Sequence, residues 1–347
     1  METNQFNKKT NKLIMEQTYT FLTTKELLYR KIIDIFAPFY AKKVSVSAII
    51  VPGYTLLKNL TALSSGTSAL IGVFMKNDTK ENVFIKKYVF QNKGLRYASL
   101  LNELGILQLL QNKNLTHLKK FNLVIPELKR VIQKNNEITI ICEYKAGEPL
   151  LQKDENIKVE TLRKVFAAMR YINSAIQEDI NTLPKRNAYV LAITFLYFWV
   201  KMSIKKIHTM PKNISLLINF YAQFFLTRGT NNTYGLVHRD LHSRNILLHK
   251  NDIIITDWEG TVISDSTYDV AMVARLYMNE ISVSNMIHLL KELLPTQSER
   301  RRFLYSIIFY TVQTLGLDKK DAKSYQDADA YITILKNQVQ PSLLTTN

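Results

Sequence analysis

The sequence is poor in cysteine, glycine, proline and long apolar runs. Its 347 residues include one cysteine, Cys142, which excludes an intrachain disulfide and any CxxC zinc or redox motif. Ten glycines and eight prolines leave room for long helices and exclude a collagen-like or low-complexity chain. Hydrophobic residues make up 46% and charged residues 22%, which excludes a largely disordered chain. The lone cysteine favours a reducing compartment.

Segments long enough to cross a membrane are also missing. The longest uncharged apolar run, 188–200, has 13 residues, whereas a spanning helix needs about 20. We interpret this run as a buried helix, and an interfacial helix remains the alternative. The polar start of the chain lacks the apolar core of a secretory signal. We therefore expect a cytoplasmic protein without a transmembrane segment.

Basic residues outnumber acidic ones, 46 to 29, which gives a formal net charge of +17. Such a surface attracts anions such as nucleotides, nucleic acids or anionic membranes. The lysines are scattered along the chain, so a solvated lysine-rich surface is the plainer interpretation. No recognised nucleic-acid module is present, and we expect no specific nucleic-acid partner. Weak association with a membrane surface, driven by the net charge, stays open.

Apolar patterning predicts an α+β chain in three parts. Residues 1–45 show an amphipathic helical pattern and form an N-terminal extension. Between 51 and 89, short β-branched and aromatic runs separated by polar turns at 64–68 and 76–82 predict an antiparallel sheet. A helix at 97–111 and strands near 124–125 and 138–142 complete this lobe, which we bound at 46–145.

The remainder, 146–347, is predicted to be mainly helical. It begins with a polar bend at 146–156 and carries helical apolar stripes, with breaks at Pro295 and Gly316. One segment, 235–260, differs: it reads as a loop, a strand, a tight turn near Lys250 and a second strand.

That segment carries the chemical motifs. Residues 238–245 read His-Arg-Asp-Leu-His-Ser-Arg-Asn, and Asp257-Trp258-Glu259 begins twelve residues after Asn245. The first motif has the spacing of a kinase catalytic loop, in which an aspartate orients or deprotonates the acceptor hydroxyl. The second falls where such enzymes place the carboxylate that binds Mg²⁺.

Phosphoryl transfer asks mainly for positioning and for stabilisation of charge on the phosphate oxygens. Mg²⁺ prefers oxygen ligands, which Asn245 and Asp257 offer from the two ends of a predicted hairpin. Asp240 then faces the acceptor hydroxyl. Glu259 is either a second metal ligand or a surface acid, and both interpretations stay open.

These motifs resemble those of a known group, the aminoglycoside phosphotransferase and choline kinase group of the protein kinase-like fold. That group shows His-x-Asp-x-x-x-x-Asn followed by Asp-x-Asp/Glu, often as IleAspTrpGlu, and this chain has IleThrAspTrpGlu at 255–259. The resemblance covers about residues 55–275. It implies a bilobal α+β fold with a small antiparallel-sheet N-lobe and a large, mainly helical C-lobe.

The resemblance also implies residues that bind ATP. A strand lysine steadies the phosphates, and Lys86 is the candidate, with Lys87 as its rival because neighbouring strand residues face opposite ways. A helix glutamate, Glu103, pairs with that lysine. A turn at 64–68 covers the phosphates, although it holds one glycine where a richer loop would be typical. Its candidate residues are Ser65, Gly66, Thr67 and Ser68.

A hinge is implied after the last strand of the first lobe. Residues 141–150 resemble it, and backbone groups of Glu143, Tyr144 and Lys145 would meet adenine. His238 and Asp269 are interpreted as structural, with Asp269 anchoring the catalytic loop from the following helix.

Together these features predict transfer of the γ-phosphate of ATP, with Mg²⁺, to a hydroxyl of a small molecule such as a sugar, amino sugar or amino alcohol. A protein serine/threonine kinase is the first alternative, but only eleven residues separate Asp257 from Asp269 and no AlaProGlu motif follows. A nucleotide-binding module without turnover is the second alternative, although none of the motif residues is missing. The net charge of +17 argues against polycationic aminoglycosides without excluding them.

Overall fold

The computed structural model divides into two compact units. Unit 1 reaches to Leu115 and adds Ile125–Gly147 and Thr256–Gly260, and unit 2 holds Thr116–Val124, Glu148–Ile255 and the chain from Thr261 onwards. The structure describes residues 50–60, 68–89, 95–113, 115–134, 137–183, 185, 188–205, 210–227, 234–317, 330–335 and 337–338. The predicted extension 1–45 lies outside these residues.

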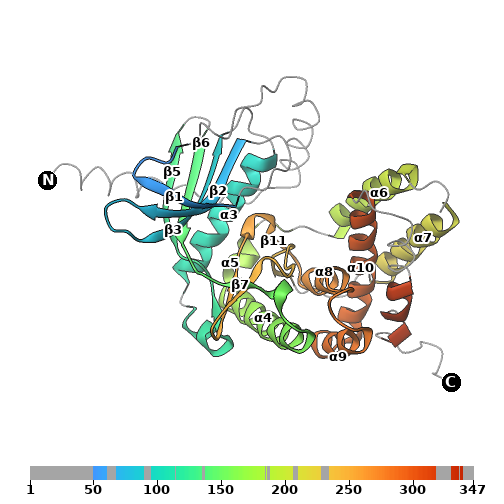
Figure 1. Cartoon of the computed structure of the whole chain (residues 1–347). Coiled ribbons are helices and arrows are strands. Elements are labelled where there is room, and N and C mark those ends of the chain that lie inside the picture. The colour runs from blue at the N-terminus through green and yellow to red at the C-terminus, as the bar shows by residue number, and fades with distance from the viewer. Residues whose placement is uncertain are drawn as a thin grey trace. The chain divides into compact units, whose positions relative to one another are not determined.

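Unit 1 is built on a five-stranded sheet in the order β1-β2-β3-β6-β5, in which every neighbouring pair is antiparallel (Figure 1). Its elements are β1 (Tyr54–Asn59), β2 (Ser68–Lys76), β3 (Asn82–Val89), helix α3 (Leu95–Asn112), β5 (Leu128–Lys134) and β6 (Glu137–Glu143). The polar turn predicted at 76–82 does join two antiparallel strands, β2 and β3.

The central strand β3 shows why this sheet forms. Val83 and Ile85 alternate along it and pack with Phe74 and Ile141 in one buried cluster. Lys86 therefore points to the opposite face, because successive side chains of a strand alternate. On that face its partner is Glu103 of α3. The predicted helix is present and extends slightly beyond 97–111 at both ends.

Two strand predictions in this region need correction. Strand β5 was missed, because Lys129, Arg130 and Lys134 interrupt its apolar pattern, as an edge strand tolerates. The strand expected at 124–125 is the two-residue β4 (Leu123–Val124), which belongs to unit 2 and pairs in parallel with β10 (Asp252–Ile255).

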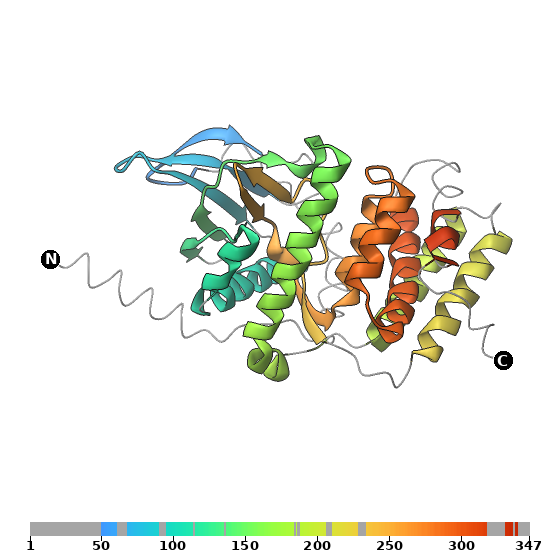
Figure 2. The same ribbon diagram turned by 90° about the horizontal axis from the view of Figure 1, so that it is seen from below.

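Unit 2 is mainly helical, as predicted. Its helices are α4 (Glu155–Ala175), α5 (Gln177–Thr182), α6 (Ala188–Lys205), α7 (Met210–Leu226), α8 (Thr267–Leu276), α9 (Val283–Leu293) and α10 (Gln297–Leu317). Helix α10 packs against α6, α7 and α8 (Figure 2), and every residue from Arg302 to Val312 is buried, so the middle of this helix is enclosed on all sides. Pro295 precedes α10, and the helix ends one residue beyond Gly316.

The motif segment, 235–260, and its neighbours in the chain form short strands. These strands are β7 (Glu148–Pro149), β8 (Tyr234–Val237), β9 (Ile246–His249), β10 (Asp252–Ile255) and β11 (Val262–Asp265). Strands β9 and β10 form an antiparallel hairpin with the predicted tight turn, where Lys250 has a left-handed φ of 53°. Strands β8 and β11 pair antiparallel. In the described part of the chain, no helix combines the length and apolar character needed to cross a membrane.

Candidate active site

A buried lysine collects two carboxylates in unit 1. Lys86, near the middle of β3, is 6% exposed, and its Nζ donates to Glu103 Oε1 at 2.8 Å and Oε2 at 3.1 Å. The same Nζ donates to Asp257 Oδ1 at 2.7 Å. The predicted pairing of Lys86 with Glu103 is thus present, and Asp257 joins it from 171 residues away along the chain.

The charges around Lys86 decide its protonation. Burial alone acts to lower its pKa, but Glu103 and Asp257 together hold that pKa well above its ordinary value. Lys86 is therefore a fixed cation. Nearby Cys142, the only thiol, is buried on β6, and burial raises its pKa to about 12. Its thiol stays protonated and is a packing group rather than a nucleophile.

Lys87, the rival of Lys86, points elsewhere. Its Nζ donates to the backbone oxygen of Ile50 at 3.0 Å and lies 3.2 Å from Glu137 Oε2. Of the two lysines, Lys86 alone joins the carboxylate cluster. This outcome follows from the two-residue period of the strand.

The buried side chain of Trp258 fixes the position of the Asp257-Trp258-Glu259 motif. Asp257 has a left-handed φ of 64°, an arrangement that non-glycine residues adopt mainly in special local settings. Trp258 follows in a short 3₁₀ turn and is 1% exposed, so it anchors the turn in the core of unit 1. Asn102 of α3 donates from its Nδ2 to the backbone oxygen of Glu259 at 3.3 Å.

The cluster has the donors that a divalent cation needs. One carboxylate oxygen from each of Glu103, Asp257 and Glu259 lies within 4.8 Å of the others. Hard cations such as Mg²⁺ take oxygen ligands of this kind. Three carboxylates beside the single cation Lys86 leave a local excess of negative charge, so the residues fit a divalent ion.

The catalytic-loop motif lies in unit 2, where Asn245 braces Asp240. Its Nδ2 donates to Asp240 Oδ2 at 2.9 Å and to the Asp240 backbone oxygen at 3.0 Å. This contact fixes the Asp240 carboxylate and turns the Asn245 side-chain oxygen, its potential metal ligand, away from it. The Asp240 side chain is 43% exposed, so it is accessible to a substrate.

Asp269 holds the start of the loop from α8. It is buried, and its two oxygens accept from the backbone N–H groups of His238 and Arg239, each at 2.7 Å. Arg239 has a left-handed φ of 65°. Burial raises the pKa of Asp269 to about 6, against the opposing effect of the two N–H groups. The predicted anchoring contact is present.

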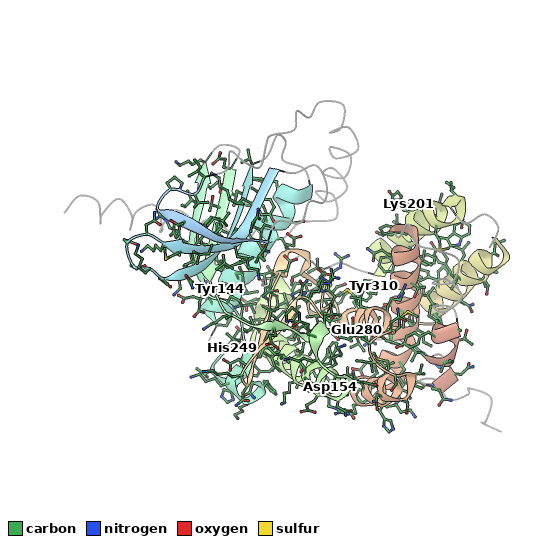
Figure 3. The ribbon with its side chains drawn as sticks, viewed as in Figure 1. Tyr144, Asp154, Lys201, His249, Glu280 and Tyr310 are labelled. Carbon is green, nitrogen blue, oxygen red and sulfur yellow. The ribbon has the colours of Figure 1, made fainter. Side chains whose placement is uncertain are left out.

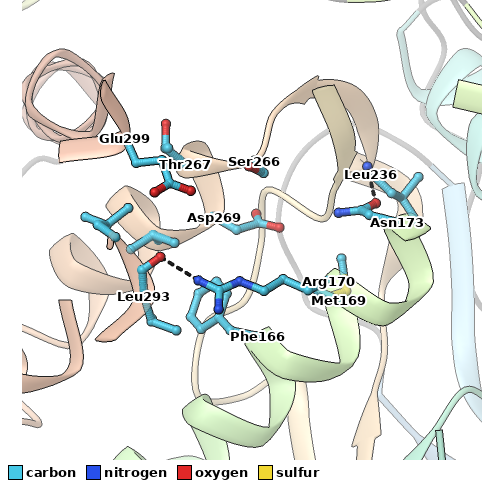
Figure 4. A pocket seen from close by; sticks show the side chains of 12 residues that line it. Phe166, Met169, Arg170, Asn173, Leu236, Ser266, Thr267, Asp269, Leu293 and Glu299 are labelled. Carbon is cyan, nitrogen blue, oxygen red and sulfur yellow. Dashed lines mark hydrogen bonds between the residues drawn. The ribbon is translucent and has the colours of Figure 1, made fainter. Parts of the chain in front are cut away.

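A small pocket borders Asp269 on the side of α4 (Figure 4). Asn173 of α4 reaches across it, and its Oδ1 accepts from Leu236 N at 2.6 Å. A Cβ on Gly235 would lie 2.5 Å from Asn173 Nδ2, so only glycine fits there without a shift. Asn173 thus supports β8, the strand before the catalytic loop. No local sequence pattern predicts this role.

A second brace holds the middle of the loop. Ser243 Oγ donates to Glu280 Oε1 at 3.0 Å, and Glu280 Oε2 lies 3.2 Å from the buried Lys158 Nζ of α4. Figure 3 labels Glu280. The backbone N–H of Leu151 donates to the Ser243 backbone oxygen at 3.1 Å. Sequence reasoning missed Glu280 and Lys158, because they lie outside every motif.

The predicted hinge residues follow β6. The N–H of Glu143 already donates to the backbone oxygen of Glu127 at 2.7 Å, and its side chain lies 2.6 Å from Lys145 Nζ. Tyr144 and Lys145 continue in an extended segment toward β7. The predicted phosphate turn lies almost wholly outside the described residues: Ser65, Gly66 and Thr67 are not described, and Ser68 begins β2.

Comparisons with known proteins bear on the family and the fold of the chain. The profile described as "Phosphotransferase enzyme family" matches residues 60–303, so the chain belongs to that family. A comparison with curated proteins found no match. The family membership and the two-part α+β architecture confirm the resemblance and the fold class expected from the motifs.

Solved structures are similar at low identity. Aminoglycoside phosphotransferase APH(4)-Ia, as a thermostable mutant with ADP and hygromycin B, has a TM-score of 0.53 at 14% identity over 82% of this chain and 93% of that one. Spectinomycin phosphotransferase APH(9)-Ia, with ADP and spectinomycin, has 0.53 at 10% over 82% and 92%. Choline kinase from Cryptosporidium parvum has 0.49 at 15% over 89% and 95%. The first two support a shared protein kinase-like fold.

Proposed function

We propose that the protein transfers the γ-phosphate of ATP to a hydroxyl group of a small molecule, with Mg²⁺ as the metal. The observation that carries this proposal is the buried Lys86 held between Glu103 and Asp257. Burying the ionised Lys86 and Glu103 costs free energy that apolar side chains would not, so such a cluster is poor evidence of stabilisation alone. Its purpose is better explained by ligands that carry both signs of charge, such as a metal-bound triphosphate.

Each residue of the cluster has one task. Lys86 binds phosphate oxygens, and Glu103 keeps its Nζ in place through two contacts. Asp257 and Asn245 hold Mg²⁺, and Glu259 is a further ligand. The ion, when bound, would neutralise charge on the phosphate oxygens of the donor. Because Lys86 is held as a cation, it keeps this role across the physiological pH range.

Asp240 prepares the acceptor. Its carboxylate accepts the hydrogen bond of the incoming hydroxyl and receives the proton as the oxygen–phosphorus bond forms. Asn245 holds one Asp240 oxygen at 2.9 Å, which fixes the direction of the carboxylate. Asp269 and Glu280 support this loop from beneath and position Asp240 without touching the substrate.

Adenine binding falls to the segment after β6. Because the Glu143 N–H is already engaged by Glu127, the backbone groups of Tyr144 and Lys145 are the better donors and acceptors for the base. Ser65, Gly66 and Thr67, which precede β2 in the sequence, supply phosphate contacts in this proposal. The ADP and AMP-PNP complexes of the similar structures support a nucleotide donor.

The acceptor is a small polyol or amino alcohol. The similar structures hold hygromycin B or spectinomycin, which supports this class of acceptor. A peptide acceptor is less compatible, because β11 and α8 occupy the chain between Glu259 and Asp269 and leave no extended segment for peptide docking.

The test is a screen of sugars, aminocyclitols and amino alcohols for ADP release by the purified full chain with ATP and Mg²⁺. Asp240→Asn should abolish turnover on any acceptor found and leave ATP binding within about twofold of wild type. Asp252→Asn, an exposed aspartate on β10, is the matched control and should retain full activity.

Two results would contradict the proposal. Full turnover by Asp240→Asn would remove its assigned role. Tight ATP binding without ADP release on any small hydroxyl compound or peptide would favour the nucleotide-binding module instead.

A further inference from the structure

Helices α6 and α7 each expose a row of apolar residues to which the proposed phosphoryl transfer assigns no role. On α6 the exposed residues recur at helical spacing, so they lie along one side of the helix. On α7 a similar row runs the length of the helix. We call these residues the α6–α7 apolar face: Ile193, Leu196, Tyr197, Val200 and Ile204 on α6, and Ile214, Ile218, Phe225 and Leu226 on α7.

The opposite sides of α6 and α7 pack against each other and against α10. Phe195 and Phe220 stack at 3.7 Å between ring centroids, and Tyr221 OH donates to the Ala192 backbone oxygen at 3.1 Å. Both helices also pack on α10, and α7 lies at an edge of unit 2 with α10 between it and α8 (Figures 1 and 2). The exposed side chains therefore take no part in the core of unit 2. Ile193 and Ile204 are 73% and 74% exposed.

Charge identifies what covers this face. Residues 180–233 contain seven lysines and arginines and no aspartate or glutamate. Lys201 lies on α6 itself, among the exposed apolar residues (Figure 3). Exposed apolar side chains, aromatic rings and basic residues without acids are the composition of helices that lie in the interface of an anionic bilayer.

A second copy of the chain is the weaker candidate. Two copies would bring seven cations against seven with no acid in either segment, and like charges oppose association. An anionic lipid surface carries the charge opposite to that of Lys201 on α6 (Figure 3) and of the acid-free segment 180–233 as a whole, and each basic residue near a membrane adds to the attraction. The chain's net charge of +17 acts in the same direction.

We propose that the α6–α7 apolar face is a peripheral membrane-docking surface, which inserts its isoleucine and aromatic side chains between the head groups of anionic phospholipids. In this proposal the attachment lies in the plane of the interface, as it does for helices with exposed apolar side chains on one side. Docking at this face does not depend on phosphoryl transfer, so the two can be tested apart.

The first experiment measures flotation of the full chain with vesicles of phosphatidylcholine alone and of equal parts phosphatidylcholine and phosphatidylglycerol. Wild type should bind the anionic vesicles, and raised salt should weaken binding. Ile193→Glu combined with Ile218→Glu should lower the partition coefficient by roughly tenfold or more, because two inserted side chains become charged. Ile50→Glu is the matched control: Ile50 is also 73% exposed but belongs to unit 1.

The second experiment uses the two tryptophans of the chain. Trp199 lies on α6, whereas Trp258 is buried in unit 1. Anionic vesicles that contain brominated lipid should quench the fluorescence of wild type and leave that of Trp199→Phe unchanged. Because fluorescence reports contact directly, this readout stands even where a glutamate variant folds poorly.

Three outcomes would overturn the proposal. One is the absence of binding to anionic vesicles at low salt. Another is equal binding by wild type and the double glutamate variant, with no quenching of Trp199, which would place the contact elsewhere. The third is a concentration-dependent dimer of wild type that the double variant loses while vesicle binding is unchanged, which would assign the face to a second copy.

Discussion

Each of the two units buries an ionic group, and the two groups differ in balance. In unit 2, Arg302 Nε meets Asp265 Oδ2 at 2.7 Å, and Thr267 donates to the other oxygen of Asp265 from its N and Oγ1 at 3.0 and 2.9 Å. One cation faces one carboxylate, and the side chains are 2% and 4% exposed. The charges of this buried pair balance one to one.

The Lys86 cluster of unit 1 is open by comparison. One cation faces Glu103 and Asp257, a third carboxylate from Glu259 lies close by, and the Asp257 side chain is 34% exposed. The surplus of carboxylates and the access of solvent are what a site awaiting a cation would have. The balance of charges and the solvent exposure of the carboxylates thus separate a structural ion pair from a functional one more clearly than the burial of the lysine or arginine does.

Removing Asp257 should have the largest effect on activity. Asp257→Asn takes away a carboxylate that we propose as a metal ligand, and should lower kcat by about a thousandfold or more, comparable to losing a main electrostatic contribution. Stability should change by no more than about 1 kcal/mol, because Glu103 still neutralises Lys86. Steady-state kinetics and urea unfolding measure the two effects, and a variant that lost stability but kept kcat would contradict the contrast.

Removing Asp265 should do the reverse. Asp265→Asn leaves Arg302 buried without its countercharge, which should cost about 3–5 kcal/mol of the free energy of unfolding. Activity per folded molecule should be retained. Combining it with Arg302→Met should restore part of the loss, since a buried pair replaced by an apolar side chain is often tolerated. An additive double variant in urea unfolding would show that the pair is not coupled.

Asp269 should give stability a pH dependence of known sign. Its folded pKa, about 6, is above its ordinary value of 3.8, so the folded state binds the proton more tightly than the unfolded state does. The stabilisation is therefore complete below about pH 4 and is lost as the pH rises through 6, by at most about 3 kcal/mol. The difference in unfolding free energy between wild type and Asp269→Asn, measured from pH 4 to 7, isolates this effect. A difference that does not change with pH would be inconsistent with the burial of this carboxyl group.

Loosening the Ser243 brace should have the smallest effect. Glu280→Gln weakens the contacts to Ser243 and Lys158 and should lower kcat by roughly tenfold, while KM for ATP stays unchanged. Glu292→Gln, a surface acid bound to Arg163, is the control and should leave kcat unaltered. Rescue of kcat by Glu280→Asp would support a positioning role for Glu280. Equal losses of kcat in Glu280→Gln and Glu280→Asp would point to general destabilisation.

Much of the candidate site could be predicted from sequence because its parts lie in short motifs. Asp240 and Asn245 are five residues apart, and Asp257 and Glu259 share a turn, so local spacing identified them. Lys86 and Lys87 could not be told apart by spacing, since the distinction depends on which face of β3 meets α3. The contact between Lys86 and Glu103 in the structure makes that distinction.

The supporting residues escaped because they act across long sequence separations. Asn173 and Leu236 are 63 residues apart, and Ser243 and Glu280 are 37 apart. No periodic pattern or motif links such positions, and their contacts exist only once the helices pack. Strand β5 escaped for a different reason: its charged residues are tolerated at an edge and hide its apolar alternation.

The left-handed backbone at Asp257 and Arg239 limits how this enzyme can be redesigned. Asparagine and glycine populate that region readily, whereas β-branched residues are strained there. A variant library that randomises either position would therefore be dominated by folding defects rather than by altered chemistry. Substitutions that probe the proposed metal site should start from Glu259 or Asn245, where no left-handed backbone is required.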